Sequence, residues 1–198
     1  PENERALAFL RHLVEPGHVT PAFVTTLTEE PSRTIFGGGR AVFHRNWPYA
    51  WGLFQREGSA VKDRVGVTVL PHHPGHESTA ALGGWQLAVN VHSRHYEAAE
   101  KLVAFLSSAR VQKAVAAAYG LSPSRRTLYS DPELLAAQPF LAQLVSVMES
   151  ARPRPVTPLY IAISQVLQAE FSAAVSGARP AGVALAGAQA QVEEILAR

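Results

Sequence analysis

A short stretch with many aromatic side chains constrains the fold of this chain more than any other. It covers residues 37–51, where Trp47, Tyr49 and Trp51 lie close together in a chain of 198 residues that has three Trp and five Tyr. Just before them, residues 41–43 have the apolar pattern of a short buried strand. The aromatic side chains are therefore expected at the carboxyl end of a strand, the edge at which α/β proteins bind ligands.

A second cluster of the same character, Gly83-Gly84-Trp85, precedes an apolar run at residues 87–91 that has the pattern of a strand. Glycine lets the backbone come close to whatever the Trp85 ring faces. Flat rings with polar rims suit a ligand that has both apolar faces and hydroxyl groups. A further strand is expected over residues 65–70.

Apolar residues at helical spacing predict helices over most of the remaining chain. The first helix is expected to end near Gly17, and a capping box from Thr26 to Glu29 opens a short helix that ends at Gly37. Further helices are expected from an N-cap at Ser93 to about residue 106, over 111–118, from Asp131, from Pro139 to about 148, over 158–176 and over 183–196. The proline-rich segment 152–158 must be extended, because residues before proline avoid the helical region.

Composition excludes several classes of protein. The formal charge of +2 comes from scattered Lys and Arg rather than a basic run, so nucleic acid is not expected as a partner. The chain has no cysteine, which excludes disulfides and thiol catalysis. The histidines of residues 72–77 do not have the spacing of a helix-borne zinc site, so we predict a solvated loop, no metal site and no cofactor. No initiating Met or signal peptide is present, and the chain is expected to be a piece of a longer protein.

These motifs, taken in order, resemble the sugar-binding proteins of ABC importers, the group that includes maltose- and trehalose/maltose-binding proteins. The motifs that carry the resemblance are Gly39-Arg40-Ala41-Val42, Asn46-Trp47-Pro48-Tyr49-Ala50-Trp51, Val65-Gly66-Val67-Thr68-Val69-Leu70-Pro71, Leu82-Gly83-Gly84-Trp85, residues 98–103 and Arg154-Pro155-Val156-Thr157-Pro158-Leu159-Tyr160. Each motif alone is weak, and together they are specific. The resemblance spans the whole chain but matches only the carboxyl-terminal half of the family.

The resemblance implies an α/β fold of the periplasmic-binding-protein type (type II), carboxyl-terminal portion only. Two lobes would close on a sugar, with residues 1–89 and 136–198 in the second lobe and the helices of residues 90–135 in the first. The implied partners are a maltose- or trehalose-type disaccharide or malto-oligosaccharide, the permease subunits of an ABC transporter, and the missing amino-terminal lobe. The implied location is periplasmic or extracellular, either free or tethered to a membrane through the missing segment.

The resemblance also assigns ligand-binding residues by position. The sugar-stacking aromatic residues would be Trp47, Tyr49 and Trp85; Gly83 and Gly84 would provide the close backbone approach, and Arg154 would bond sugar hydroxyls. The physical chemistry agrees, because stacking the C–H face of a pyranose on an indole buries apolar area at about 25 cal/mol per Å². Arginine has five fixed donors for the hydroxyls at the ring edge. Trp51 is left open, since its position also fits core packing.

Two other function classes are left open by the residues. An enzyme acting on sugars would need a pair of carboxylates beside the aromatic rings. The site motifs contain no Asp or Glu, and the nearest acid, Glu57, is expected on a surface segment. We therefore predict no catalytic residue. A sugar-sensing receptor domain would share the same fold and site, and would differ by a fused membrane segment.

Overall fold

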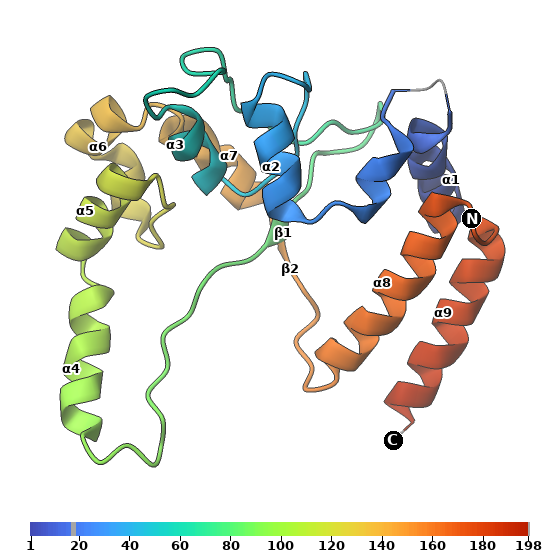
Figure 1. Cartoon of the computed structure of the whole chain (residues 1–198). Coiled ribbons are helices and arrows are strands. Elements are labelled where there is room, and N and C mark those ends of the chain that lie inside the picture. The colour runs from blue at the N-terminus through green and yellow to red at the C-terminus, as the bar shows by residue number, and fades with distance from the viewer. Residues whose placement is uncertain (17–18, 198) are drawn as a thin grey trace. The chain divides into compact units, whose positions relative to one another are not determined.

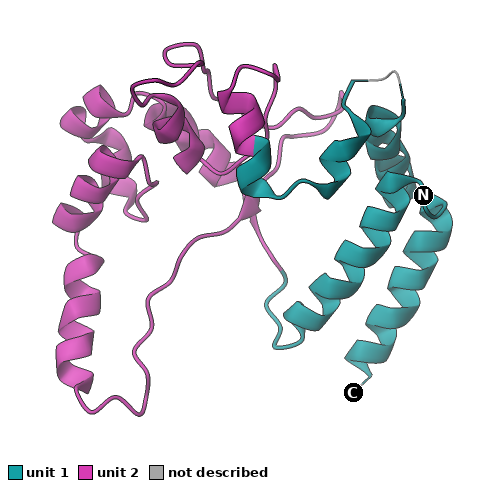
Figure 2. Ribbon diagram, in the orientation of Figure 1, with its two compact units in different colours: residues 1–32, 155–198 teal, residues 33–154 magenta. Residues whose placement is uncertain are grey.

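The computed structural model describes residues 1–16 and 19–197, and helices make up most of its regular structure (Figure 1). The chain divides into two compact units, one formed by residues 1–32 and 155–198 and the other by residues 33–154 (Figure 2). The boundary falls within helix α2 (Glu29–Gly37). Each unit has a small hydrophobic core of its own.

The first unit is helical. Its elements are α1 (Glu2–Val14), the 3-10 helix η1 (Ala22–Thr26), α8 (Tyr160–Ser176) and α9 (Ala181–Leu196). Leu7, Ala174 and Ala184 form the buried core, and the two alanines are small enough for α8 and α9 to pack closely. Between these two helices the buried carboxylate of Glu170 accepts a hydrogen bond from Arg179 Nη1 at 2.5 Å, which compensates the burial of its charge.

The second unit contains short helices and one small sheet. Its helices are α3 (Tyr49–Phe54), α4 (Tyr96–Leu106), α5 (Ala109–Tyr119), η2 (Arg126–Ser130), α6 (Pro132–Ala137) and α7 (Leu141–Ser150). Its strands are β1 (Ala81–Leu82) and β2 (Arg152–Pro153), which pair in parallel. The buried core lies among α5, η2, α6 and α7 and is formed by Ala116, Leu128, Leu134, Phe140, Leu141 and Leu144.

Trp51, which the sequence left open between ligand and core, packs against this core. Its ring lies 4.6 Å from the ring of Phe140 between centroids, at an interplanar angle of 31°. Trp51 itself is partly buried, and on the same helix Ala50 and Phe54 are buried. Helix α3 is therefore held in the core by its inward face, and Trp51 is a packing residue.

The predicted helices are present, but two of their predicted starts are wrong. Thr26 does not begin a capping box: it lies in η1, where its hydroxyl donates to the carbonyl of Phe23 at 2.8 Å. Ser93 is not the N-cap of α4, which begins at Tyr96, because its hydroxyl accepts the N–H of His95 at 3.2 Å. In both places the hydroxyl that was expected to cap a helix forms a hydrogen bond within a local turn instead. The first helix ends at Val14, and the expected end near Gly17 lies outside the described residues.

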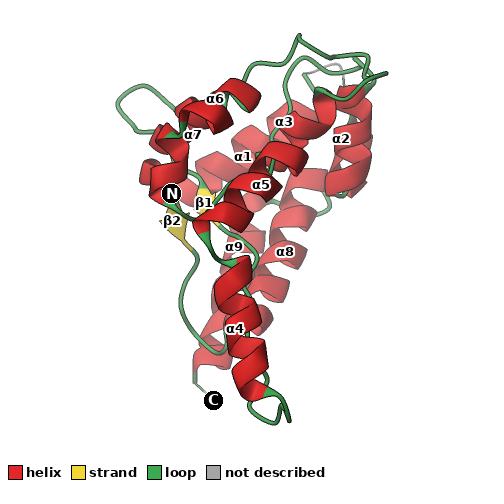
Figure 3. Cartoon of the chain, turned by 90° about the vertical axis from the view of Figure 1, so that its left-hand side faces the viewer, coloured by secondary structure: helices red, strands yellow, loops and turns green. Residues whose placement is uncertain are grey.

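The predicted strands are wrong. Residues 41–43, 65–70 and 87–91 are not paired as strands, and in the described part of the chain β1 and β2 form the whole of the sheet (Figure 3). Val42 and Phe43 are exposed rather than buried. A strand exists only where a neighbour accepts and donates its backbone hydrogen bonds. These segments have strand-like sequences but no neighbouring strand among the described residues.

His44 lies between the α2 and α3 aromatic side chains of the second unit. Its ring stacks on Phe36 at 5.3 Å between centroids and meets Phe54 edge-on at 6.3 Å. Burial lowers the pKa of His44 below its ordinary value, and the positive charges of Arg33 and Arg45 lower the pKa further. The folded chain therefore favours the neutral imidazole.

This shift predicts a pH-dependent stability. The pKa of His44 is lower in the folded chain than in the unfolded chain. The stability that His44 contributes is therefore fully present above its ordinary pKa of about 6.5, and it is lost as the pH falls through the lower pKa of the folded chain. Replacement by Phe keeps the stacking but removes the titration. Between pH 7.5 and pH 5, the free energy of unfolding measured by urea denaturation should decrease less for His44→Phe than for the original chain. Equal curves for the original chain and His44→Phe would contradict the assignment.

Candidate ligand-binding site

The structure brings three of the predicted site residues together in the second unit: Trp47, Gly83 and Arg154. A Cβ atom built on Gly83 would lie 2.8 Å from Cη2 of Trp47 and 3.2 Å from Nη2 of Arg154. Atoms at such distances leave no room for a side chain, so the indole and the guanidinium both contact the backbone of Gly83. An apolar ring and a cationic hydrogen-bond donor therefore meet at one point of the chain.

The small parallel sheet places two of these residues side by side. In its register Ala81 is opposite Arg152 and Leu82 is opposite Pro153. Gly83 and Arg154 are the next residues after the carboxyl ends of the two strands. Carboxyl ends of parallel strands share one edge of a sheet, which is where ligand sites are built in α/β folds. The sequence placed the aromatic residues Trp47, Tyr49 and Trp85 at strand ends, and in the structure it is Gly83 and Arg154 that follow the two strands.

Trp47 reaches this edge from the segment that precedes α3. Its backbone N–H donates to Oδ1 of Asn46 at 2.6 Å, and its carbonyl accepts the N–H of Ala50 at 3.1 Å. Because Ala50 is buried, this second bond ties Trp47 to a helix fixed in the core. The Trp47 residue is still 43% exposed. One edge of the indole thus contacts Gly83 while part of the residue faces solvent.

The other predicted site residues have different surroundings. Tyr49 is the first residue of α3 and is half-buried. Trp85 is fully exposed, and a Cβ atom built on Gly84 would meet nothing within 4 Å. Trp85 does not stand directly at a strand end, because β1 stops at Leu82. The roles of all six predicted residues in ligand binding stay predictions.

Asn46 is a residue of this region to which sequence reasoning gave no role. Its carboxamide oxygen bonds Trp47, whereas its Nδ2 atom is buried and has no hydrogen-bond partner among the described residues. The sequence could have pointed to Asn46 because it lies directly before Trp-Pro. Short polar side chains often form hydrogen bonds with the backbone of a neighbouring residue.

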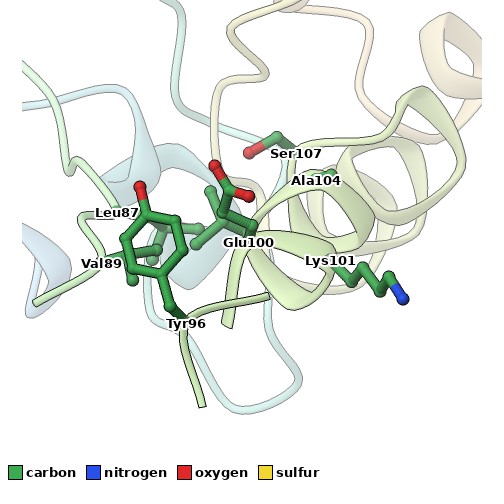
Figure 4. Close-up of a pocket in the computed structure, with 8 residues that line it drawn as sticks. Leu87, Val89, Tyr96, Glu100, Lys101, Ala104 and Ser107 are labelled. Atoms are coloured by element: carbon green, nitrogen blue, oxygen red, sulfur yellow. The ribbon is translucent and has the colours of Figure 1, made fainter. Parts of the chain in front are cut away.

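A separate groove of about 670 Å³ lies along α4 (Figure 4). Leu87, Val89 and Tyr96 form much of its wall, together with Glu100 and Ser107. Leu87 is 55% exposed, and the extended segment that carries it has no strand partner in the described chain. None of the predicted ligand-binding residues lines this groove.

The histidine-containing loop at residues 72–77 does not assemble a metal site. Among the described residues, no group of three His, Cys, Asp or Glu side chains is placed to hold a metal ion. Within the same described part of the chain, no helix has both the length and the apolar character needed to cross a membrane.

Comparison with known proteins gives a consistent result. The family model for bacterial extracellular solute-binding proteins matches residues 1–142. A probable ABC transporter-binding protein of Deinococcus radiodurans is 41% identical over 175 residues, which are 88% of this chain and 41% of that protein. A probable amino-acid ABC transporter periplasmic-binding protein of Sinorhizobium fredii is 29% identical over 77% of this chain and 34% of that protein.

The structural comparison agrees with the sequence comparison. Maltose-bound MalE3 of T. maritima superposes with a TM-score of 0.93 and 40% sequence identity, covering 98% of this chain and 50% of that chain. The expected periplasmic-binding-protein fold is thereby confirmed, and the chain spans half or less of the length of these relatives. The match of residues 1–142 and the 41% identity together show that this chain belongs to the family of bacterial extracellular solute-binding proteins.

Proposed function

We propose that this chain is the carboxyl-terminal half of a protein that delivers a maltose- or trehalose-type disaccharide to an ABC importer. The observation that supports this most strongly is the contact of Trp47 and Arg154 with one glycine, Gly83. The likeness to a maltose-bound protein at 40% identity supports the same ligand class. The protein would act outside the cytoplasm and would have no catalytic residue and no cofactor.

The chemistry of the contact suits a sugar ring. A pyranose has a face of C–H groups that can lie on the open part of the Trp47 indole, and this burial is favourable by about 25 cal/mol per Å². Its hydroxyl groups lie at the ring edge, where the Arg154 guanidinium can donate to adjacent oxygens. A stacking surface with charged donors at its rim is the arrangement that a polyhydroxylated ring requires.

An amino-acid ligand is the second candidate, because one relative has a name of that kind. Such a ligand carries a carboxylate and an ammonium group, and each needs a partner when it is removed from water. Arg154 could bond the carboxylate. The predicted site residues include no Asp or Glu for the ammonium group, nor the pair of carboxylates that a sugar hydrolase would need. The described site therefore favours an uncharged sugar over an amino acid and binding over catalysis.

A sugar-sensing receptor domain remains an alternative within the same fold. Its binding site would be the same, so substitutions in the site would not distinguish a receptor from an importer component. Genes for permease subunits beside the gene for this chain would support the importer. A membrane-spanning segment fused to the same polypeptide would support the receptor.

The proposed lobes follow from the same two-lobed architecture. Residues 1–89 and 136–198 would form the second lobe, and residues 90–135 would pack with the first. Leu102 and Phe105 on α4 support this, because they are 56% and 48% exposed in this chain. The groove beside α4 offers apolar surface to the first lobe. The segment at residues 87–91 has no strand partner in the described chain, so its backbone could pair with a strand of the first lobe.

Removing the Arg154 guanidinium should weaken sugar binding. In the two-lobed protein we expect Arg154→Ala to cost about 1.5–3 kcal/mol of maltose binding, the range for hydrogen bonds to charged groups. Isothermal titration calorimetry measures this directly. Arg152→Ala is the matched control, because Arg152 is an exposed arginine of β2 only two residues before Arg154. Equal affinities of Arg154→Ala and the original protein would remove Arg154 from the site.

The proposed lobe assignment predicts a difference in hydrogen exchange. In the 198-residue chain alone, the backbone amides of α4 should exchange faster than those of α8 and α9. The physical reason is that the exposed apolar side chains of α4 have lost their partner, so local opening costs less free energy. Exchange measured by mass spectrometry should slow in α4 when the first lobe is present. A monomer with equally strong protection in both regions would contradict the assignment.

A further inference from the structure

We propose that Asn46 is a positioning residue for Trp47: its carboxamide oxygen fixes the backbone from which the stacking indole projects. This proposal rests on the proposed function, because it assigns a role in the same site. The main evidence is the hydrogen bond from the Trp47 N–H to Oδ1 of Asn46 at 2.6 Å. The bond lies in a segment without regular secondary structure, where nothing periodic would otherwise hold the backbone.

The backbone of Trp47 is restrained on both sides. Its N–H is held by Asn46, and its carbonyl is held by the N–H of Ala50 at 3.1 Å. Pro48 adds a steric restraint, because a residue before proline is confined to the extended region. Of these restraints, the Asn46 oxygen is the one side-chain hydrogen bond. It sets the direction of the peptide plane that enters Trp47.

A small change in that direction would matter at Gly83. The indole already approaches so closely that a Cβ on Gly83 would lie 2.8 Å from Cη2 and 3.1 Å from Cζ3. Rotation of the Trp47 backbone moves the far end of the indole most, because this end is the most distant from the Cα atom. The Asn46 bond therefore keeps the ring edge on the glycine and the exposed part of the ring in a fixed orientation.

The other end of the Asn46 side chain indicates that the carboxamide contributes little net stability. Nδ2 is buried and has no hydrogen-bond partner in the described chain. A buried donor without a partner is unfavourable by at least as much as one hydrogen bond is favourable. The gain from the Oδ1 bond is thus offset within the same carboxamide. Removing the whole group should leave the stability of the fold nearly unchanged.

Two substitutions at Asn46 separate orientation from stability. Asn46→Ala removes both the useful acceptor and the unpaired donor, so the indole should become mobile while the thermal midpoint stays within about 2 °C. Asn46→Asp keeps an acceptor for the Trp47 N–H but places a carboxylate oxygen where Nδ2 is buried. This variant should keep the indole ordered and lower the thermal midpoint. The two variants therefore predict opposite combinations of order and stability.

The experiment uses the 198-residue chain labelled with ¹⁵N and observes the indole N–H of Trp47 by NMR. The heteronuclear NOE of this group reports ring order, and titration with maltose gives the dissociation constant. We expect Asn46→Ala to lower the NOE and to raise the dissociation constant about three- to tenfold. Asn46→Asp should restore both values. Asn90→Ala is the matched control, because Asn90 Oδ1 accepts the N–H of His92 at 2.9 Å in an exposed loop.

Each result decides the proposal. An unchanged NOE in Asn46→Ala overturns it, and so does a large loss of thermal stability or of folding in that variant, since Asn46 would then be a structural residue. Lower order that Asn46→Asp does not restore also overturns it. If maltose shifts no indole signal of the original chain, the NOE comparison still decides the role of Asn46. In that case the proposed ligand, not the positioning role, has failed.

Discussion

The contact of an indole and a guanidinium with one glycine is the interaction on which the candidate site depends. Gly83 follows β1 and Arg154 follows β2, so the parallel pairing of only two residues per strand brings them together. Trp47 reaches the same point from the start of α3, a helix that packs on the core through Trp51. A Cβ atom on Gly83 would force the ring or the guanidinium to shift. The site thus joins three distant parts of the sequence through one position without a Cβ atom.

The scarcity of strands has a simple physical cause. Residues 65–70 and 87–91 carry the β-branched and apolar residues of strands, yet the described chain offers them no neighbour. Backbone groups in such segments bond water until a partner strand is supplied. This chain spans half of the MalE3 chain that it resembles, and we propose that the other half supplies those partners. The exposed apolar face of α4 fits the same explanation.

The helices could be predicted from the sequence because their signals are local. Asp131 caps α6 and Gly120 ends α5 with a positive φ of 70°, as turn and cap chemistry predicts. The strands could not be predicted, because pairing depends on a partner that the local pattern does not contain. Three of the predicted ligand-binding residues, Trp47, Gly83 and Arg154, lie together, and Trp51, which the sequence left open, packs on the core, while ligand binding itself stays a prediction. Asn46 was missed because its role depends on where a single oxygen points.

The central claim is that the Trp47 ring is the surface on which a sugar stacks. Titration of the 198-residue chain with maltose, followed by tryptophan fluorescence, tests it most directly. Half a cleft that loses about 4 kcal/mol of contacts binds about a thousandfold more weakly than the whole. We therefore expect a fluorescence change that appears only at high maltose concentration and is clearly smaller in Trp47→Phe. A response of the same size in Trp47→Phe would contradict the claim, and tight saturable binding by this chain alone would contradict the two-lobed cleft.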